Sequence, residues 1–285
     1  MIDLHCHSSA SDGSLTPEEL VIKAYDSGIS SLALTDHDTI SGLSKAKTTA
    51  RKVGIELISG IEFNCDCDSG ELHILGLFID ETNAELLKLI KKLEEYRKER
   101  NEKLIELLTK QGIKLDMDDL FCHNDRIENI GKPNFARALY KNGYAKNEFE
   151  AYSKYLSESN LKSIERKKIS DREALDIIHT AGGIAVLAHP DQLGIKDHKL
   201  LLSFISDLKE KGLDGIEIFY TGYKKNIIKR YKGIARKYSL LCSGGSDFHG
   251  ESKYRNNKLG FYGEKKIIPK EILDKMKDFM KSYRG

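Results

Sequence analysis

Two imidazole side chains stand two residues apart near the start of the sequence, in Met1-Ile-Asp-Leu-His5-Cys-His7. If this short apolar run is a strand, the rings of His5 and His7 leave the same face, because side chains alternate along a strand. The pair then forms a two-ligand clamp where the strand ends. The segment therefore predicts a metal site.

Further histidines and carboxylates recur where later apolar runs end. These additional ligand-type residues are Asp12, His37, Glu62, His73, His189, Asp247 and His249. Each has an ordinary alternative: a histidine within a strand, such as His73, is often a half-buried imidazole, and the glycines near Asp247 suit a tight turn. Buried charges and imidazoles are costly unless they are paired or bind metal. The set is larger than one ion needs and predicts a site for several metal ions.

The nine predicted ligands offer only nitrogen and oxygen, a donor set that suits Mn, Fe or Zn better than a thiolate-selecting ion. Two or three ions held close together would lower the pKa of a bridging water and clamp the oxygens of a phosphoryl group. Glu62 or Asp247 could bridge the ions. This chemistry indicates hydrolysis without a side-chain nucleophile, and at this point it leaves amide hydrolysis open.

The composition narrows the class of protein. The 285 residues are 40% hydrophobic and 32% charged, and 46 basic against 44 acidic residues give a net charge of +2. This balance is not the overall footprint of a protein that binds duplex nucleic acid. Five cysteines without framework spacing indicate reduced thiols, so we expect a cytoplasmic protein. No apolar run reaches the roughly 20 residues of a membrane span, so we expect no membrane partner.

The elements that must position the ligands alternate between strands and helices. Strands are expected at 2–7, 31–35, 55–63, 71–78, 184–188, 215–219 and 240–243. Helices are expected at 16–28, 41–53, 82–111, 170–181, 198–211, 223–238 and 270–282. This alternation predicts an α/β fold with a central parallel sheet. Ligands at the ends of so many strands favour a closed or nearly closed barrel, whose loops at that end build the active site.

The stretch between residues 115 and 165 breaks this alternation. It contains short helix-like pieces and no convincing strand. We therefore expect two units. Residues 1–100 and 166–285 would form the barrel with its metal site, and residues 101–165 would form a helical insertion, or cap subdomain.

Taken together, these motifs resemble the polymerase-and-histidinol-phosphatase (PHP) superfamily. The matching segments are His5-Cys-His7-Ser with Asp12-Gly13, Leu-Thr-Asp-His37-Asp-Thr, Gly-Ile-Glu62, Leu-His73-Ile-Leu-Gly, Ala-His189-Pro and Gly-Ser-Asp247-Phe-His249-Gly. The resemblance covers nearly the whole chain and implies a distorted (β/α)7 barrel with three metal ions, usually Mn. Within the superfamily, the sequence resembles stand-alone bacterial proteins with a helical insertion, which include 3′,5′-nucleoside bisphosphate phosphatases and a 5′→3′ exoribonuclease.

The resemblance also implies how the ligands divide among the ions. The implied sets are His5, His7, Glu62 and Asp247 for the first ion, Asp12, His37 and His249 for the second, and Glu62, His73 and His189 for the third, with Glu62 as the bridge. All nine positions are intact, which predicts an active enzyme. The residues expected to be catalytic are Asp12, His37, Glu62, His189, Asp247 and His249.

Expected substrate contacts come from charge and from the resemblance. Arg97 and Arg100 stand i, i+3 on one helix face and could grip a phosphate together, although a solvated charged face is the ordinary alternative. The family carries a similar arginine pair with a substrate role. The segment Gly131-Lys132-Pro-Asn134-Phe-Ala-Arg137 resembles a family segment that has Arg and His in place of Lys132 and Asn134. Unlike arginine, Lys132 cannot bind a phosphate through two parallel hydrogen bonds. The full set of expected substrate contacts is Asp12, His37, Arg97, Arg100, Lys132, Asn134 and Arg137.

These observations predict a metal-dependent phosphoesterase that hydrolyses a phosphate monoester of a small nucleotide, above all the 3′-phosphate of 3′,5′-nucleoside bisphosphates, by a metal-bridging hydroxide. One alternative is a 5′→3′ exoribonuclease on short RNA, for which Tyr140, Tyr144 and Tyr152 are aromatic candidates. A histidinol-phosphate phosphatase is disfavoured by the insertion, and a non-catalytic metal-stabilised module is disfavoured by the complete ligand set. The expected partner is a small phosphorylated nucleotide or a short oligonucleotide, and the oligomeric state is left open.

Overall fold

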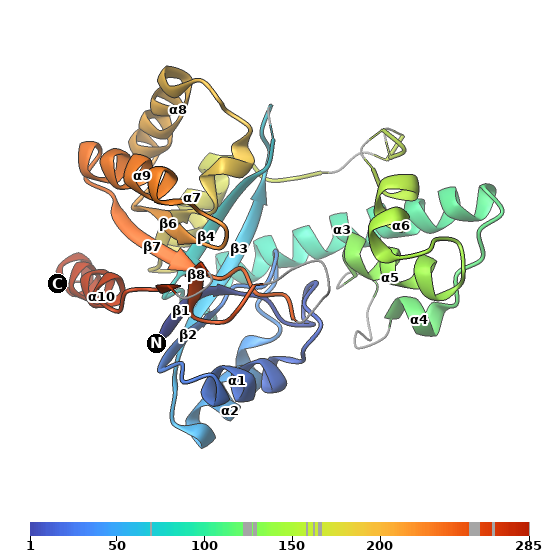
Figure 1. The fold of residues 1–285 in the computed structure, drawn as a ribbon, viewed down its shortest axis with the longest axis horizontal. Helices are drawn as coiled ribbons and strands as arrows, with labels where there is room; N and C mark the ends of the chain where they lie inside the picture. Colours follow the sequence, from blue (N-terminus) through green and yellow to red (C-terminus); the bar gives the residue numbers. More distant parts are fainter. Residues whose placement is uncertain are drawn as a thin grey trace.

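A seven-stranded sheet, curled into a nearly closed barrel, forms the centre of the molecule (Figure 1). The computed structural model describes residues 1–68, 70–121, 127, 130–157, 159–161, 163–164, 167–250, 257–263 and 266–284. The strands lie side by side in chain order: β1 (Ile2–Cys6), β2 (Ser31–Leu34), β3 (Glu56–Cys65), β4 (Leu72–Leu77), β5 (Ile184–Leu187), β6 (Gly215–Tyr220) and β7 (Leu241–Gly245). The predicted α/β barrel is therefore confirmed.

The first and last strands of the sheet meet and bring the barrel close to closure. The amide of His7 donates a hydrogen bond to the carbonyl oxygen of Phe248, and the amide of Asp247 donates to the carbonyl oxygen of His5, both at 2.9 Å. A Cβ atom at Gly245 would lie 2.1 Å from the Cβ of His5. This close approach requires glycine at position 245.

Strand β4 departs from the parallel sheet that we predicted. It pairs antiparallel with both β3 and β5, whereas the other strand pairs of the seven-stranded sheet are parallel. Only a short connection separates β3 from β4, too short for the crossover that a parallel pair needs. Because β4 runs backwards, its beginning rather than its end lies at the carboxyl ends of β3 and β5. His73, the second residue of β4, therefore lies at that end of the barrel.

Helices cover the outside of the barrel. They are α1 (Pro17–Asp26), α2 (Leu43–Val53), α7 (Asp171–Thr180), α8 (His198–Glu210), α9 (Lys225–Lys237) and α10 (Glu271–Arg284), with a 3-10 turn η2 at Pro190–Leu193. The start of α1 shows the predicted capping box, in which Thr16 and Glu19 exchange hydrogen bonds. A hairpin of β8 (Phe261–Gly263) and β9 (Lys266–Ile267) was not predicted. None of the helices among the described residues is long and apolar enough to cross a membrane.

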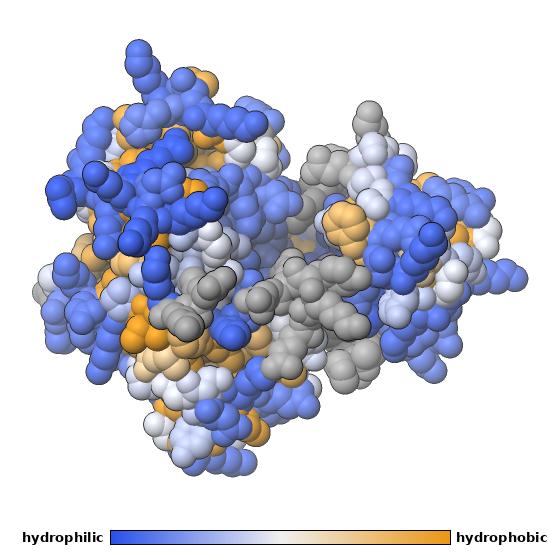
Figure 2. All heavy atoms as spheres, in the orientation of Figure 1, coloured by the Kyte–Doolittle hydropathy of each residue, from blue (hydrophilic) through white to orange (hydrophobic). Residues whose placement is uncertain are grey.

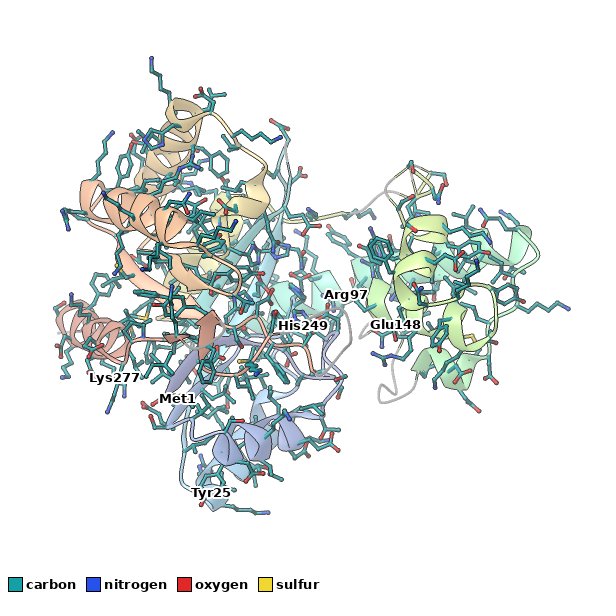
Figure 3. All side chains as sticks on the ribbon, viewed as in Figure 1. Met1, Tyr25, Arg97, Glu148, His249 and Lys277 are labelled. Atoms are coloured by element: carbon teal, nitrogen blue, oxygen red, sulfur yellow. The ribbon has the colours of Figure 1, made fainter. Side chains whose placement is uncertain are left out.

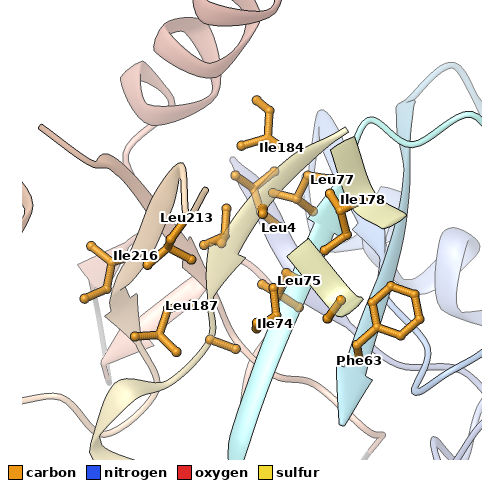
Figure 4. Packing of buried hydrophobic residues seen from close by; sticks show 14 of the residues in the cluster. Leu4, Phe63, Ile74, Leu75, Leu77, Ile178, Ile184, Leu187, Leu213 and Ile216 are labelled. Carbon is orange, nitrogen blue, oxygen red and sulfur yellow. The ribbon is translucent and has the colours of Figure 1, made fainter. Parts of the chain in front are cut away.

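Apolar side chains from the strands and from α7 fill the main core, part of which Figure 4 shows. Leu4 on β1, Phe63 on β3 and Ile178 on α7 are among its fully buried members. A second core packs α1 and α2 against β1 and β2. Burial on both faces explains why the strands read as continuous apolar runs rather than alternating ones.

A third core lies away from the barrel, on the right of Figure 1. It is formed by the second half of α3 (Ala84–Lys110) together with α4 (Met117–Phe121), α5 (Lys132–Lys141) and α6 (Glu148–Tyr155). In α3, Leu86 and Leu93 belong to the barrel core, whereas Leu104 and Leu108 belong to the third core. This division supports our proposal that residues 101–165 form a cap subdomain, although α3 itself continues across the proposed boundary.

Candidate metal centre and substrate pocket

Nine side chains converge at one end of the barrel, near the label of His249 in Figure 3. They are the nine predicted from the sequence, and we call them the ligand cluster: His5, His7, Asp12, His37, Glu62, His73, His189, Asp247 and His249. His5 and His7 lie at the end of β1 with their Nε2 atoms 3.1 Å apart. The convergence follows from the strand directions, because the parallel strands end here and β4 begins here.

Glu62 lies at the centre of the cluster and is fully buried. Its two carboxylate oxygens lie 3.0–3.2 Å from ring nitrogens of His5, His7, His37, His73 and His189. One carboxylate therefore touches five imidazoles that come from four different strands or the loops that follow them. This is the position that a bridging ligand requires.

Two aspartates extend the cluster on the side of the last strand. Asp247 Oδ1 lies 3.2 Å from Nε2 of His7 and 3.4 Å from Nε2 of His5. Asp12 Oδ1 lies 3.2 Å from Nε2 of His249, whose other ring nitrogen lies 3.4 Å from Asp247 Oδ1. Asp12, Asp247 and His249 thus form a continuous run of oxygen and nitrogen donors.

The donor atoms fit divalent metal ions. The Nε2 atoms of His5 and His7 are too close to face each other without a proton or a cation between them. Among the described residues, the buried Oε2 atom of Glu62 has no hydrogen-bond partner, and such an atom calls for a positive partner. The ligand atoms fall into four overlapping groups, each within 4.8 Å: His7, Asp12, His37 and His249; His5, His7 and Asp247; His5, Glu62 and His189; His37, Glu62 and His73. Overlap of this kind is what a site for several ions requires.

Burial and charge set the protonation of the cluster. Burial opposes ionisation of Glu62, but the charges of the surrounding imidazoles, including His5, outweigh it and hold the pKa of Glu62 well below its usual range. Burial lowers the pKa of His37 to about 3, which leaves its ring neutral. Burial also disfavours a charged His7, but the neighbouring carboxylates of Asp247 and Glu62 prevail and raise the pKa of His7 to about 10. Protons and metal cations therefore compete for the same nitrogens.

Two residues that the sequence reasoning missed orient the ligands. Glu217, in the middle of β6 and fully buried, has one oxygen 3.2 Å from Nδ1 of His5 and accepts a hydrogen bond from the amide of His189 at 2.8 Å. Tyr220, at the end of β6, donates a hydrogen bond of 2.8 Å to Oδ2 of Asp247. Burial raises the pKa of Tyr220 above its ordinary value, so the hydroxyl keeps its proton. Contacts of this kind fix which atom of a ligand faces the metal.

The backbone is strained at three positions of the site. Asp38, His189 and Asp247 have φ values of 53°, 24° and 53°, in a region that residues other than glycine rarely adopt. Such strain persists only where surrounding contacts enforce it, and it concentrates at functional sites. A separate contact shapes the loop that carries Asp12: the buried carboxylate of Asp36 accepts hydrogen bonds from Ser8 and Ser11.

The ligand cluster opens into a cavity of about 260 Å³ between the barrel and the cap. Its other side, which we call the basic wall, is lined by Arg97, Arg100, Lys132, Lys167 and Lys168. Two tyrosines, at positions 96 and 152, lie beside these cations and also line the cavity. The label of Arg97 in Figure 3 lies between the ligand cluster and the cap.

The cations of the basic wall are already engaged. Arg97 donates hydrogen bonds of 2.8 Å to the carbonyl oxygen of His37 and to Oδ2 of Asp38. Arg100 donates to Oδ1 of Asn101. The ammonium of Lys132 lies 5.6 Å from the ring centroid of Tyr152. Lys167 and Lys168 were not singled out in the sequence, where they look like ordinary surface residues.

Several predicted substrate residues lie elsewhere. Asn134 and Arg137 are on α5 but are not among the residues that line the cavity. The side chain of Asn134 accepts a hydrogen bond from the amide of Gly131 and so caps the helix that begins at Lys132. Tyr140 and Tyr144 also lie outside the cavity, whereas Tyr152 lines it.

Comparison with known proteins decides the family. Residues 3–238 match the model of the PHP domain. The chain belongs to the PHP domain family. It is accordingly a metal-dependent hydrolase of phosphoester bonds.

Relatives within the PHP family are similar over most of the chain. A 5′-3′ exoribonuclease of Haemophilus influenzae is 36% identical over 87% of this chain and 89% of its own length. A 3′,5′-nucleoside bisphosphate phosphatase of Chromobacterium violaceum is 34% identical over 87% of both chains. The crystal structure of a Bifidobacterium adolescentis protein described as a metal-dependent phosphoesterase is 27% identical, has a TM-score of 0.84, and covers 96% of this chain and 94% of its own.

Proposed function

We propose that this PHP protein removes the 3′-phosphate of a 3′,5′-nucleoside bisphosphate. The observation that supports this substrate is the arrangement of one cavity with two different anion-binding sides, the ligand cluster and the basic wall. A phosphate monoester would react at the cluster while a second phosphate is held at the wall. The similarity to a bisphosphate phosphatase agrees with this arrangement.

We assign the nine residues of the ligand cluster as holders of three divalent ions, Mn in the first place and Fe or Zn as alternatives, because all the donors are nitrogen or oxygen. The proposed division is the one that the family resemblance implies, with Glu62 shared. When bound, such ions supply activation of a water for attack on phosphorus and neutralisation of charge on the phosphoryl oxygens.

The protein's own groups would position the reacting phosphate. Glu62 and Asp247 stay ionised at neutral pH, because the surrounding imidazoles hold both carboxyl pKa values well below their usual range. Tyr220 keeps one oxygen of Asp247 occupied, so only Oδ1 faces the cluster. His189 is buried and keeps its ring against Glu62, so it is held in one orientation at the edge of the cavity.

The basic wall would hold the second phosphate and the base. Arg97 and Arg100 present guanidinium groups to the cavity, and guanidinium can pair with a phosphate through two parallel hydrogen bonds. Lys132 supplies a point charge beside the ring of Tyr152, which offers a flat surface to a nucleobase. This combination fits a nucleotide better than histidinol phosphate, which has one phosphate and no large base.

The test is phosphate release by Mn-loaded protein from 3′-phosphoadenosine 5′-phosphate, with histidinol phosphate and a 5′-phosphorylated RNA pentamer as rival substrates. We expect release of the 3′-phosphate with AMP as the remaining product. The His189→Ala variant serves as the inactive control. Turnover of histidinol phosphate in preference to the bisphosphate would refute the substrate assignment.

A second candidate is trimming of short RNA from its 5′ end, which uses the same chemistry on a diester. Two observations favour it: the similarity to the Haemophilus influenzae exoribonuclease, and the partly exposed Tyr152 at the cavity, on which a further base could stack. Mononucleotides released from the pentamer at a higher kcat/KM than phosphate from the bisphosphate would make this the main activity.

A further inference from the structure

The helix α9 and the residue before it carry an unusual concentration of positive charge. Between positions 224 and 237 there are seven basic residues and no acidic one: Lys224, Lys225, Lys229, Arg230, Lys232, Arg236 and Lys237. The whole chain carries +2, so the remainder of the chain carries a net charge of −5. The net positive charge of the chain therefore depends on this one segment.

Four of these cations form a single exposed row, which we call the α9 stripe: Lys225, Lys229, Lys232 and Arg236. They follow one another at intervals of four, three and four residues, so they lie on one face of the helix. At 1.5 Å per residue, the stripe is about 17 Å long. Hydrophilic side chains dominate the viewed surface over α8 and α9 in Figure 2.

The cations of the α9 stripe form no ion pair with an acidic residue that the structure describes. Some lysines elsewhere do pair with carboxylates, as Lys47 does with Glu81 at 2.7 Å and Lys211 with Asp171 at 2.7 Å. None of the seven cations forms an ion pair with an acidic residue in the described ranges. The contacts found are of another kind, such as Lys232 Nζ at 4.9 Å from the ring centroid of Phe219.

Most of this arrangement works against the stability of the helix, whereas Arg236 in the last turn favours the helix dipole. Like charges four residues apart repel each other, as Lys225 and Lys229 do, and as Lys232 and Arg236 do. Cations in the first turn also oppose the helix dipole, and Lys225 is the first residue of α9. Local features that conflict with the fold are expected where a function requires them. The stripe is thus better explained by a partner than by the fold.

The partner must be a polyanion that binds by charge rather than by insertion. A helix that binds a membrane surface buries its apolar face in the lipid. Here the apolar face, with Ile228, Tyr231 and Ile234, is buried in the barrel core. No large apolar side chain of α9 is exposed. A single nucleic-acid strand that runs along the stripe would bring several phosphates beside its four cations.

The stripe also begins beside the catalytic end of the barrel. Tyr223, which precedes α9, accepts a hydrogen bond of 3.1 Å from the amide of Asp191, two residues after His189. Tyr220 contacts Asp247 of the ligand cluster. The first turn of α9 is therefore joined through both tyrosines to the loops that carry ligands.

We propose that the α9 stripe is a binding surface for the phosphate backbone of single-stranded RNA, outside the catalytic cavity. It rests on the charge, exposure and lack of acidic partners of four residues, and it stands whether or not the 3′-phosphate of a bisphosphate is the preferred substrate. A single row of cations can contact the backbone of one strand. A duplex would present a second backbone, for which the stripe has no cations.

The test measures binding of the metal-loaded full chain to a fluorescent oligouridylate of about 12 nucleotides, longer than the stripe. Phosphorothioate linkages keep its charge and resist hydrolysis. The test variant carries Lys225→Gln, Lys229→Gln, Lys232→Gln and Arg236→Gln. The matched control removes four exposed lysines on other helices, by Lys45→Gln, Lys52→Gln, Lys88→Gln and Lys281→Gln. Anisotropy is recorded over a range of salt concentrations.

We expect the stripe variant to bind at least about tenfold more weakly than wild type at low salt. The slope of log K against log salt concentration should become shallower by about three, since each single-strand phosphate contact contributes roughly 0.7. The control should bind like the wild-type protein. Both variants should turn over the small bisphosphate at the wild-type rate, because neither alters the cavity. Each half of the stripe, tested as Lys225→Gln/Lys229→Gln and Lys232→Gln/Arg236→Gln, should give about half of the slope change.

Several outcomes would overturn the proposal. Equal losses in the stripe and control variants would show that net charge alone matters. Unchanged binding by the stripe variant would also contradict the proposal. So would tighter binding of the wild-type protein to an RNA duplex than to the single strand. Binding to phosphatidylserine vesicles without binding to the oligouridylate would assign the stripe to a membrane surface.

Discussion

The two sides of the cavity are built differently. The ligand cluster consists of buried or nearly buried groups, and a central member such as Glu62 contacts five others. The basic wall consists of partly exposed cations such as Lys132 and Lys167, carried by α3, α5 and the chain near residue 167. The cluster is fixed from many directions, whereas the wall depends on single side chains. We infer that the cluster sets the chemistry and that the wall sets the substrate.

The strongest test of this contrast is removal of charge at the centre of the cluster. We expect Glu62→Gln to lower kcat/KM by at least about 1,000-fold, a loss on the scale of removing a main electrostatic contact in a transition state. We also expect it to reduce the number of bound metal ions, because the amide is a poor bridge. Metal content by mass spectrometry and phosphate release measure the two effects. Full metal occupancy with normal turnover would show that Glu62 is not central.

A smaller effect is expected at Tyr220, which contacts the ligand Asp247 from outside the cluster. Tyr220→Phe removes the hydrogen bond to Asp247 and leaves the ring in place. Loss of such an orienting contact typically costs about 10- to 100-fold in metal affinity or activity. Metal titration followed by calorimetry measures the affinity directly. An unchanged affinity would mean that the barrel alone holds Asp247 in position.

The wall should respond in KM rather than in metal binding. We expect Arg100→Ala to raise KM for a nucleoside bisphosphate about tenfold, since a charged contact to phosphate is lost. Lys132→Arg should lower KM, because it restores a planar group that can grip phosphate with two hydrogen bonds. Steady-state kinetics on the bisphosphate, with AMP as a singly phosphorylated comparison, separates binding from chemistry. A change in metal content in either variant would break the division between wall and cluster.

The smallest expected effect is on stability, and it comes from a pair outside both the ligand cluster and the basic wall. His179 pairs with Asp214 at 2.8 Å, and this hydrogen bond raises the pKa of His179 above its ordinary value. The pair therefore stabilises the fold fully below the unfolded-state pKa of about 6.5, and this stabilisation is lost as the pH rises through the higher folded-state value. Because the site is partly exposed, we expect less than about 1 kcal/mol. Urea unfolding of His179→Gln should show a larger deficit relative to wild type at pH 6 than at pH 9. An equal deficit at both pH values would count against a charged pair.

The contrast between the two sides also explains what could be predicted from the sequence. The nine residues of the cluster were visible because histidines and carboxylates at strand ends are unusual. Glu217 carried a weaker signal of the same kind, an acid inside the apolar run of β6, and was overlooked. The role of Tyr220 depends on a side-chain direction that spacing alone does not give.

The wall was harder to predict because lysines and arginines are common on any surface. Arg97, Arg100 and Lys132 line the cavity, but so do Lys167 and Lys168, which lie beyond the cap in the sequence. The reversal of β4 was missed for a related reason. An apolar run looks the same in either direction, and only the length of the connection after β3 could have indicated it.

The meeting of β1 with the segment after β7 has a consequence for how the protein becomes active. The hydrogen bond between the amide of Ser246 and the carboxylate of Asp3 joins residues 243 positions apart. Contacts of such separation form late in folding, because a long loop must close first. His5 and His7 therefore meet Asp247 and His249 only when the barrel shuts. A chain still being synthesised, or one that has unfolded at this seam, holds an incomplete set of ligands and should be unable to hydrolyse anything.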